Sequence, residues 1–327
     1  MPRMRQRTFG RGGPLVSEIG HGTWAMGGHW GPRDDAAALA ALRAGLESGI
    51  HFLDTAHGYG HGHSERLIAR ALRETGARPF VATKCPPKNL AWPPKPGVPV
   101  QEVFPGRHLI EVTEYSLKNL GTECLDLQQL HVWEDAWLTQ GDWLEAVRLL
   151  KAQGKIRRFG VSLNDHQPEN GLKLVASGLI DSVQVIYNLF DQRARERLFP
   201  LCREKGVAVI VRVPLDEGGL SGALTPQTRF PKGDWRAHYF QGDRLRETCE
   251  RAAAFEFLRR PPFTSLAQAA LKFCLMEPAV STVVVGMRSL EHVRANVEVS
   301  DFEGFSEEEL KKAYTFSWPR NYYPHYG

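Results

Sequence analysis

Residues 51–84 read HFLDTAHGYGHGHSERLIARALRETGARPFVATK and contain a complete strand–helix–strand pattern. The segment His51–Asp54 is short and apolar before its final carboxylate, as expected of a buried strand. In Ser64–Leu72 the apolar residues recur at the spacing of one helix face, and Phe80–Lys84 is again rich in β-forming residues. The stretch therefore predicts a β/α unit that leads into a second, parallel strand.

The same alternation continues on both sides of this stretch. Further strands are expected near Glu18–Thr23 and at Leu125–His131, Ile156–Ser162, Val183–Tyr187, Val207–Val213 and Thr282–Val285. Further helices are expected at Leu109–Leu120, Trp143–Leu150, Gly171–Ala176, Arg195–Lys205, Ser265–Met276 and Leu290–Val297. The strands are apolar throughout, which is typical of a parallel sheet that is buried on both faces. Eight such units favour a closed (β/α)8 TIM barrel over an open sheet, so we expect an α/β fold with residues 1–327 in a single domain.

The bulk composition excludes several classes of protein. A formal net charge of +4 over 327 residues is too weak to indicate a nucleic-acid partner. No apolar run is long enough for a membrane span, and the basic residues 1–7 are not followed by the apolar segment of a signal peptide. Scattered cysteines without a C-x-x-C pair predict reduced thiols and a cytoplasmic protein. A monomer and a small homo-oligomer are both compatible with the sequence.

Two long segments follow expected strands. Cys85–Pro105 is rich in proline and glycine, and Asp216–Phe263 is an insertion after the strand at Val207–Val213. The active site of a (β/α)8 barrel lies at the carboxyl ends of its strands, which we call the C-terminal rim. We therefore expect both segments to line or cover a site and to decide its substrate.

Ionisable residues stand where three successive strands end. Asp54, followed by Tyr59, ends one strand, Lys84 ends the next, and His131 ends the third. An ammonium beside a phenol stabilises the phenolate, so Lys84 is expected to lower the pKa of Tyr59. Asp54 can pair with Lys84, and His131 can bind a carbonyl oxygen. The set predicts an acid/base site that needs a cofactor for hydride chemistry.

These motifs, in this order, resemble the aldo-keto reductase superfamily. The resemblance covers roughly residues 7 to 300 and rests on six pieces of sequence: Gly49–Gly60 with Ser64-Glu65, Val81–Lys84, Asp126–His131, Gly160–Ser162, Gln184 with Tyr187-Asn188, and Pro214-Leu215. It implies a (β/α)8 barrel, an NADP(H) cofactor (with NAD(H) as an alternative) and a small carbonyl or alcohol substrate. It also implies a catalytic tetrad of Asp54, Tyr59, Lys84 and His131.

The resemblance further implies which residues bind the cofactor. Ser162 and Gln184 should hold the nicotinamide carboxamide, and Arg288 the adenosine 2′-phosphate. The full expected set is Thr23, Trp24, Asp54, Ser162, Asn164, Gln184, Tyr187, Arg212, Pro214, Leu215, Gly286, Arg288, His292 and Asn296. The expected substrate pocket is Trp24, Tyr59 and Trp133.

The sequence departs from the family pattern at three of these places. Leu163 precedes Asn164 where the family has asparagine directly after the serine, and His292 stands where it often has a second arginine. Arg212 replaces an aromatic residue that stacks on nicotinamide. A guanidinium can also stack on a ring, and its charge would disfavour the cationic, oxidised cofactor. The alternative for Arg212 is an ion pair with Asp216 or Glu217.

Other interpretations remain open at this stage. The histidines His57, His61 and His63 have a spacing that invites a metal site, but no carboxylate or cysteine at matching spacing supports one, so no metal is expected. A non-catalytic, nucleotide-sensing subunit of the same fold is the main alternative to an enzyme. A metal-dependent sugar isomerase would need Glu, Asp and His ligands at several strand ends.

Overall fold

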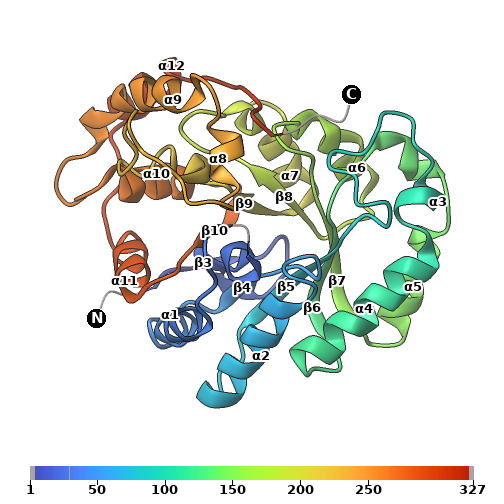
Figure 1. Ribbon diagram of the computed structural model, residues 1–327. Helices are drawn as coiled ribbons and strands as arrows, with labels where there is room; N and C mark the ends of the chain where they lie inside the picture. Colours follow the sequence, from blue (N-terminus) through green and yellow to red (C-terminus); the bar gives the residue numbers. More distant parts are fainter. Residues whose placement is uncertain (1–3, 29, 324–327) are drawn as a thin grey trace.

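A computed structural model describes residues 4–28 and 30–323. Eight parallel strands form a closed barrel in the order β10-β3-β4-β5-β6-β7-β8-β9 (Figure 1). Their bounds are β3 Ile19–Gly22, β4 Phe52–Asp54, β5 Phe80–Cys85, β6 Leu125–Leu130, β7 Ile156–Ser162, β8 Ser182–Ile186, β9 Ala208–Arg212 and β10 Val280–Gly286. The barrel predicted from the β/α alternation is confirmed, with strand ends within about two residues of those expected.

Helices surround the barrel (Figure 1). Those that follow a strand on the outside are α1 Asp35–Glu47, α2 His63–Thr75, α4 Gly106–Leu120, α5 Trp143–Ala152, α6 Leu172–Ser177, α7 Leu198–Lys205, α10 Leu266–Leu275 and α11 Leu290–Glu298. The remaining helices are α3 Val100–Val103, α8 Arg236–Tyr239, α9 Arg244–Ala253 and α12 Glu307–Thr315. Among the described residues, no helix is both long and apolar enough to span a bilayer.

The core has two parts that meet at the strands. Inward-facing residues such as Phe52, Phe80 and Leu127 fill the barrel, and a larger cluster lies between the strands and the surrounding helices. An antiparallel hairpin of β1 Gln6–Thr8 and β2 Leu15–Ser17 contributes Phe9 to the barrel filling, with its ring 4.8 Å from that of Phe80. The barrel is therefore packed solid beneath the C-terminal rim.

Several elements lie outside the predicted set: the hairpin, α1, α12 and the helices α8 and α9 inside the 216–263 insertion. The start of α12 could have been recognised in the sequence, because Ser306 and Glu309 form a reciprocal capping box. In α1 only Leu39 and Leu42 among the five buried residues are large and apolar, so the apolar periodicity is weak, but Asp34 caps the helix by accepting a hydrogen bond from the Ala37 N–H. Small residues and caps identify these helices better than apolar spacing does.

Candidate active site

The strand alternation aims the predicted tetrad into the barrel mouth. Asp54 shares its face of β4 with Phe52, and Lys84 shares its face of β5 with Phe80, both of which fill the barrel. His131 directly follows β6 and has the same parity as Leu127. Since β4, β5 and β6 are adjacent and parallel, their carboxyl ends bring the three side chains to one place on the rim.

A tight turn after β4 brings Tyr59 to the same place. The Tyr59 N–H donates to the Ala56 carbonyl at 3.0 Å, and the His57 N–H donates to the Lys84 carbonyl at 3.2 Å. The backbone of Tyr59 also packs directly on Gly27. A Cβ at position 27 would lie 2.6 Å from the Tyr59 carbonyl carbon, so only glycine allows this approach.

Lys84 is fully buried and holds the site together. Its Nζ donates to Asp54 Oδ2 at 2.7 Å, to the Thr55 carbonyl at 2.9 Å and to the Tyr59 hydroxyl at 3.2 Å. Burial alone would lower the pKa of Lys84, but Asp54 and Tyr59 raise it above its ordinary value. The lysine therefore stays charged.

The electrostatics of Tyr59 differ from the sequence expectation. Burial raises the pKa of Tyr59 and outweighs Lys84, which acts in the opposite direction. The predicted net lowering is therefore wrong for this structure: the phenol is held in its neutral, proton-bearing form beside a charged ammonium. Such a group is prepared to give a proton, and the lysine opposes the burial cost once the proton leaves.

His131 lies beside the phenol as a neutral imidazole. Its ring centre is 5.8 Å from that of Tyr59 and 5.4 Å from that of Trp92, which comes from the loop after β5. Burial lowers the pKa of His131 well below its ordinary range, and Lys84 and Arg212 lower it further. The buried Nδ1 atom has no partner among the described residues, so the ring has hydrogen-bonding capacity left for a ligand.

Asp54 links this acid/base group to the neighbouring part of the rim. Its Oδ2 accepts from Lys84, and its Oδ1 accepts from Gln184 Nε2 at 2.7 Å. Its backbone carbonyl accepts from Thr23 Oγ1 at 2.9 Å. One carboxylate thus fixes a lysine of the tetrad and a residue of the expected nicotinamide site.

The nicotinamide contacts were expected at the neighbouring strands β7, β8 and β9. Ser162 and Arg212 end β7 and β9, and Gln184 lies in β8, two residues before its end and in register with Ser162. The Arg212 guanidinium donates to Asp165 Oδ1 at 2.7 Å and to the Leu163 carbonyl at 3.0 Å. The ion-pair alternative named the wrong partner, since the carboxylate is that of Asp165 and not of Asp216 or Glu217. Arg212 Nε is buried without a partner, and its charge also acts on Tyr59 and His131.

Three residues of the expected site lie elsewhere. Trp133 is fully buried in the core, where its ring meets those of Trp137 and Trp143, so it does not line an open pocket. Tyr187 points away from the barrel interior, with its ring packed on Phe199 and Phe273. The third residue is Asn164.

Asn164 is occupied by the backbone of Trp133. Its Oδ1 accepts from the Trp133 N–H at 3.1 Å, and its Nδ2 donates to the Trp133 carbonyl at 2.9 Å. The asparagine thus ties the end of β7 to the end of β6, and its amide is used in the loop instead of being presented to a cofactor.

The expected adenosine contacts gather at the turn between β10 and α11. Gly286 ends β10, Ser289 caps α11 by accepting from the His292 N–H at 3.2 Å, and Asn296 lies buried on the same helix. Arg288 donates to the carbonyls of Trp30 at 2.6 Å and Pro32 at 3.2 Å. A cation beside the start of a helix suits a phosphate.

The other predicted rim residues also lie at the barrel mouth. The centre of the Trp24 ring lies 6.0 Å from that of Trp30 and 6.1 Å from that of Trp235. The loop after β3 therefore meets the 216–263 insertion there. Pro214 and Leu215 follow the end of β9 at Arg212 after one intervening residue, Val213. Trp92 was not part of the expected pocket of Trp24, Tyr59 and Trp133, but its ring lies beside that of His131.

Two of the three histidines after β4 lie beside different carboxylates. His57 Nδ1 lies 3.7 Å from Glu65, and His63 Nε2 lies 2.9 Å from Asp35, so the two rings have separate partners. Among residues 4–28 and 30–323, no three His, Cys, Asp or Glu side chains gather as metal ligands would.

Comparison with known proteins identifies the family. Residues 18–315 match the sequence profile described as "Aldo/keto reductase family". Aldo-keto reductase YhdN of Bacillus subtilis is 31% identical over 305 residues, which cover 90% of this chain and 88% of that protein. Pyridoxal 4-dehydrogenase of Microbacterium luteolum is 29% identical, over 89% and 92% of the two chains.

A solved structure agrees with this assignment. Glycerol dehydrogenase AKR11B4 of Gluconobacter oxydans superposes with a TM-score of 0.77 at 27% identity, over 100% of this chain and 98% of that one. The order of β4, β5 and β6, and the side chains at their ends, fit the same assignment. This chain belongs to the aldo/keto reductase family of nicotinamide-dependent oxidoreductases.

Proposed function

We propose that the protein interconverts a small aldehyde or ketone and its alcohol with NADP(H), and that Tyr59 is the general acid and base. The observation that carries the proposal is the contact at 3.2 Å between the Lys84 ammonium and the Tyr59 hydroxyl at the barrel mouth. The nicotinamide, when bound, supplies or accepts the hydride. The chain's own residues bind the carbonyl oxygen and move its proton.

In the reductive direction the carbonyl oxygen is held by the Tyr59 hydroxyl and the His131 ring. Tyr59 gives its proton to this oxygen as negative charge develops there. The resulting phenolate faces the Lys84 ammonium, an attraction on the order of 5 kcal/mol at 3.2 Å with an effective dielectric constant of about 20. This attraction exists only once the proton leaves, so it stabilises the transition state more than the ground state.

Donors at the ends of β7–β10 support the cofactor part of the proposal. Arg212 has an unpartnered buried Nε, and Ser162 and Gln184 lie in register with each other on the nearby strands β7 and β8. Arg288 and the start of α11 favour a phosphate, and with it NADP(H) over NAD(H). Asp165 neutralises much of the charge of Arg212, so we propose only a modest preference for the neutral, reduced nicotinamide.

A carbonyl screen followed at 340 nm with NADPH and with NADH tests the proposal. The panel should include short aldehydes, pyridoxal and glycerol-derived carbonyls. We expect Tyr59→Phe to lower kcat by about 10³-fold while the dissociation constant for NADPH stays within twofold. Tyr115→Phe, at a tyrosine that is 58% exposed, is the matched control and should leave kcat unchanged.

Two outcomes would contradict the proposal. Wild-type turnover in Tyr59→Phe would show that the Tyr59 hydroxyl is not the general acid or base. Tight NADPH binding by the wild type without turnover of any carbonyl in the panel would favour a nucleotide-sensing subunit instead.

A further inference from the structure

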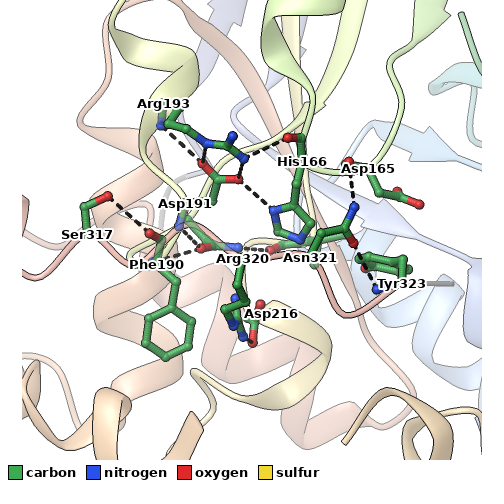
Figure 2. Close-up of polar contacts among 12 residues, drawn as sticks. Asp165, His166, Phe190, Asp191, Arg193, Asp216, Ser317, Arg320, Asn321 and Tyr323 are labelled. Atoms are coloured by element: carbon green, nitrogen blue, oxygen red, sulfur yellow. Dashed lines mark hydrogen bonds and ion pairs between the residues drawn. The ribbon is translucent and has the colours of Figure 1, made fainter. Parts of the chain in front are cut away.

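The segment that follows α12, residues 316–323, runs across the C-terminal rim and contacts the loops after three barrel strands (Figure 2). The Trp318 N–H donates to the Phe190 carbonyl after β8 at 2.7 Å, and Asn321 Nδ2 donates to the Asp165 carbonyl after β7 at 3.2 Å. Arg320 and Tyr323 contact the loop after β9. We call this segment the C-terminal strap.

The loop after β9 has an unfavourable backbone conformation. Val213, Asp216 and Glu217 have φ angles of 54°, 49° and 54°, in the left-handed region that only glycine adopts without strain. Three such residues within five positions will relax unless other contacts hold them. The loop begins directly after Arg212 and includes Pro214 and Leu215, so its shape bears on the proposed cofactor site.

The strap supplies those contacts through two buried carboxylates. Arg320 Nη2 lies 2.5 Å from Asp216 Oδ2, and the Tyr323 hydroxyl donates to Glu217 Oε1. Asp216 is fully buried, and Glu217 is 5% exposed, so neither carboxylate has water as an alternative partner. Each strained acidic residue therefore has one partner on the strap.

Aromatic packing fixes the strap side of both contacts. The Arg320 guanidinium lies 4.3 Å from the Trp318 ring centre and 4.8 Å from that of Phe190. The Tyr323 ring stacks on Trp235 of the insertion at 5.4 Å. The two donors are thus preorganised for Asp216 and Glu217.

We propose that Arg320 and Tyr323 are positioning residues for the nicotinamide cofactor. They act through Asp216 and Glu217 and keep the loop Val213–Gly218 in the strained conformation that fixes Arg212 and Pro214-Leu215 at the barrel mouth. The proposal rests on the function proposed above and adds that the cofactor site is completed by the strap.

The test is the dissociation constant for NADPH, measured by fluorescence titration without substrate, in Tyr323→Phe and Arg320→Gln. We expect each substitution to weaken NADPH binding about tenfold, and kcat at saturating NADPH to stay within twofold. The matched control is Tyr322→Phe, because the neighbouring hydroxyl bonds Glu247 of α9 at 2.8 Å instead of the loop. It should leave the dissociation constant within twofold.

A double variant and hydrogen exchange separate positioning from general destabilisation. Tyr323→Phe combined with Glu217→Gln should weaken NADPH binding no more than the stronger single variant, because both substitutions disrupt the same contact between Tyr323 and Glu217. Amide exchange in the 213–220 peptide should be faster in Tyr323→Phe than in Tyr322→Phe.

Equal NADPH affinities for Tyr323→Phe, Arg320→Gln and Tyr322→Phe would overturn the positioning role even if the wild type is an active reductase. A wild type that binds neither NADPH nor NADH would instead overturn the proposed function on which it rests. Unchanged exchange in the loop would likewise contradict the strap's role.

Discussion

The two sides of the barrel mouth are built differently. At the ends of β4, β5 and β6, the tetrad residues contact one another directly and depend on strand parity and one short turn. At the ends of β7, β8 and β9, Arg212 and the loop that follows it depend on residues far along the chain, including Asp165 and Arg320. The proton side is thus fixed by local sequence, whereas the proposed cofactor side is fixed by tertiary contacts.

Removing the central cation of the proton side should have the largest effect. Lys84→Met leaves Asp54 buried without its ion-pair partner and removes the charge that stabilises the phenolate. We expect kcat to fall by about 10³-fold and the free energy of unfolding by about 3–5 kcal/mol, measured by steady-state kinetics and urea unfolding. The control is Lys88→Met, which changes an exposed lysine on the following loop. A kcat within tenfold of the wild type would show that the tetrad does not act as one unit.

The two tryptophans Trp92 and Trp133 distinguish the active site from the core. Trp92→Ala removes a ring that faces His131, so we expect the KM for the carbonyl to rise about tenfold with little loss of stability. Trp133→Ala leaves a cavity in a fully buried cluster and should lower the free energy of unfolding by about 3–5 kcal/mol with KM unchanged. Michaelis curves and urea unfolding on both variants decide this. A raised KM in Trp133→Ala, with an unchanged KM in Trp92→Ala, would place Trp133 and not Trp92 in the substrate pocket.

A smaller, pH-dependent effect is expected at the strap. Burial raises the pKa of Glu217 from 4.5 to about 7. The hydrogen bond from Tyr323 acts in the opposite direction, and the charge of Asp216 adds to the rise. Because the folded state keeps this proton after the unfolded chain has lost it, the free energy of unfolding falls as pH rises from about 4.5 through about 7. Glu217→Gln removes this fall.

Urea unfolding of wild type and Glu217→Gln at several values between pH 5 and pH 8 measures the effect. The difference in unfolding free energy between the variant and the wild type should shift in favour of the variant as pH rises, by at most about 3 kcal/mol. Parallel curves for the two proteins would mean that Glu217 is ionised throughout this range.

The sequence allowed the barrel to be predicted, and with it the meeting of Asp54, Lys84 and His131 at one rim, because both follow from the succession of parallel strands, whereas Tyr59 lies on a turn and was assigned from the family resemblance. The periodicity of the strands also contained information that the motif comparison ignored. Tyr187 is three residues from Gln184 and so faces the opposite side of β8, as Val183 and Val185 do. Its outward position could therefore have been read from the sequence.

Other features could not be predicted in this way. Trp133 has the inward parity of His131, but the chain has left the strand there and turns the ring into the core. The pairs Arg212–Asp165 and Arg320–Asp216 join segments 47 and 104 residues apart, and no local pattern specifies such partners. The net pKa shift of Tyr59 depends on how deeply the finished fold buries it, which the neighbouring charges alone do not reveal.

Asp54 accepts a hydrogen bond from Lys84 on one oxygen and from Gln184 on the other, and this shared use limits how the protein can be re-engineered. A substitution at position 54 removes the partner of Lys84 and the partner of the Gln184 amide together, so neither can be tuned there independently. We expect substrate range to be easier to change through the loop that carries Trp92, whose ring lies beside that of His131.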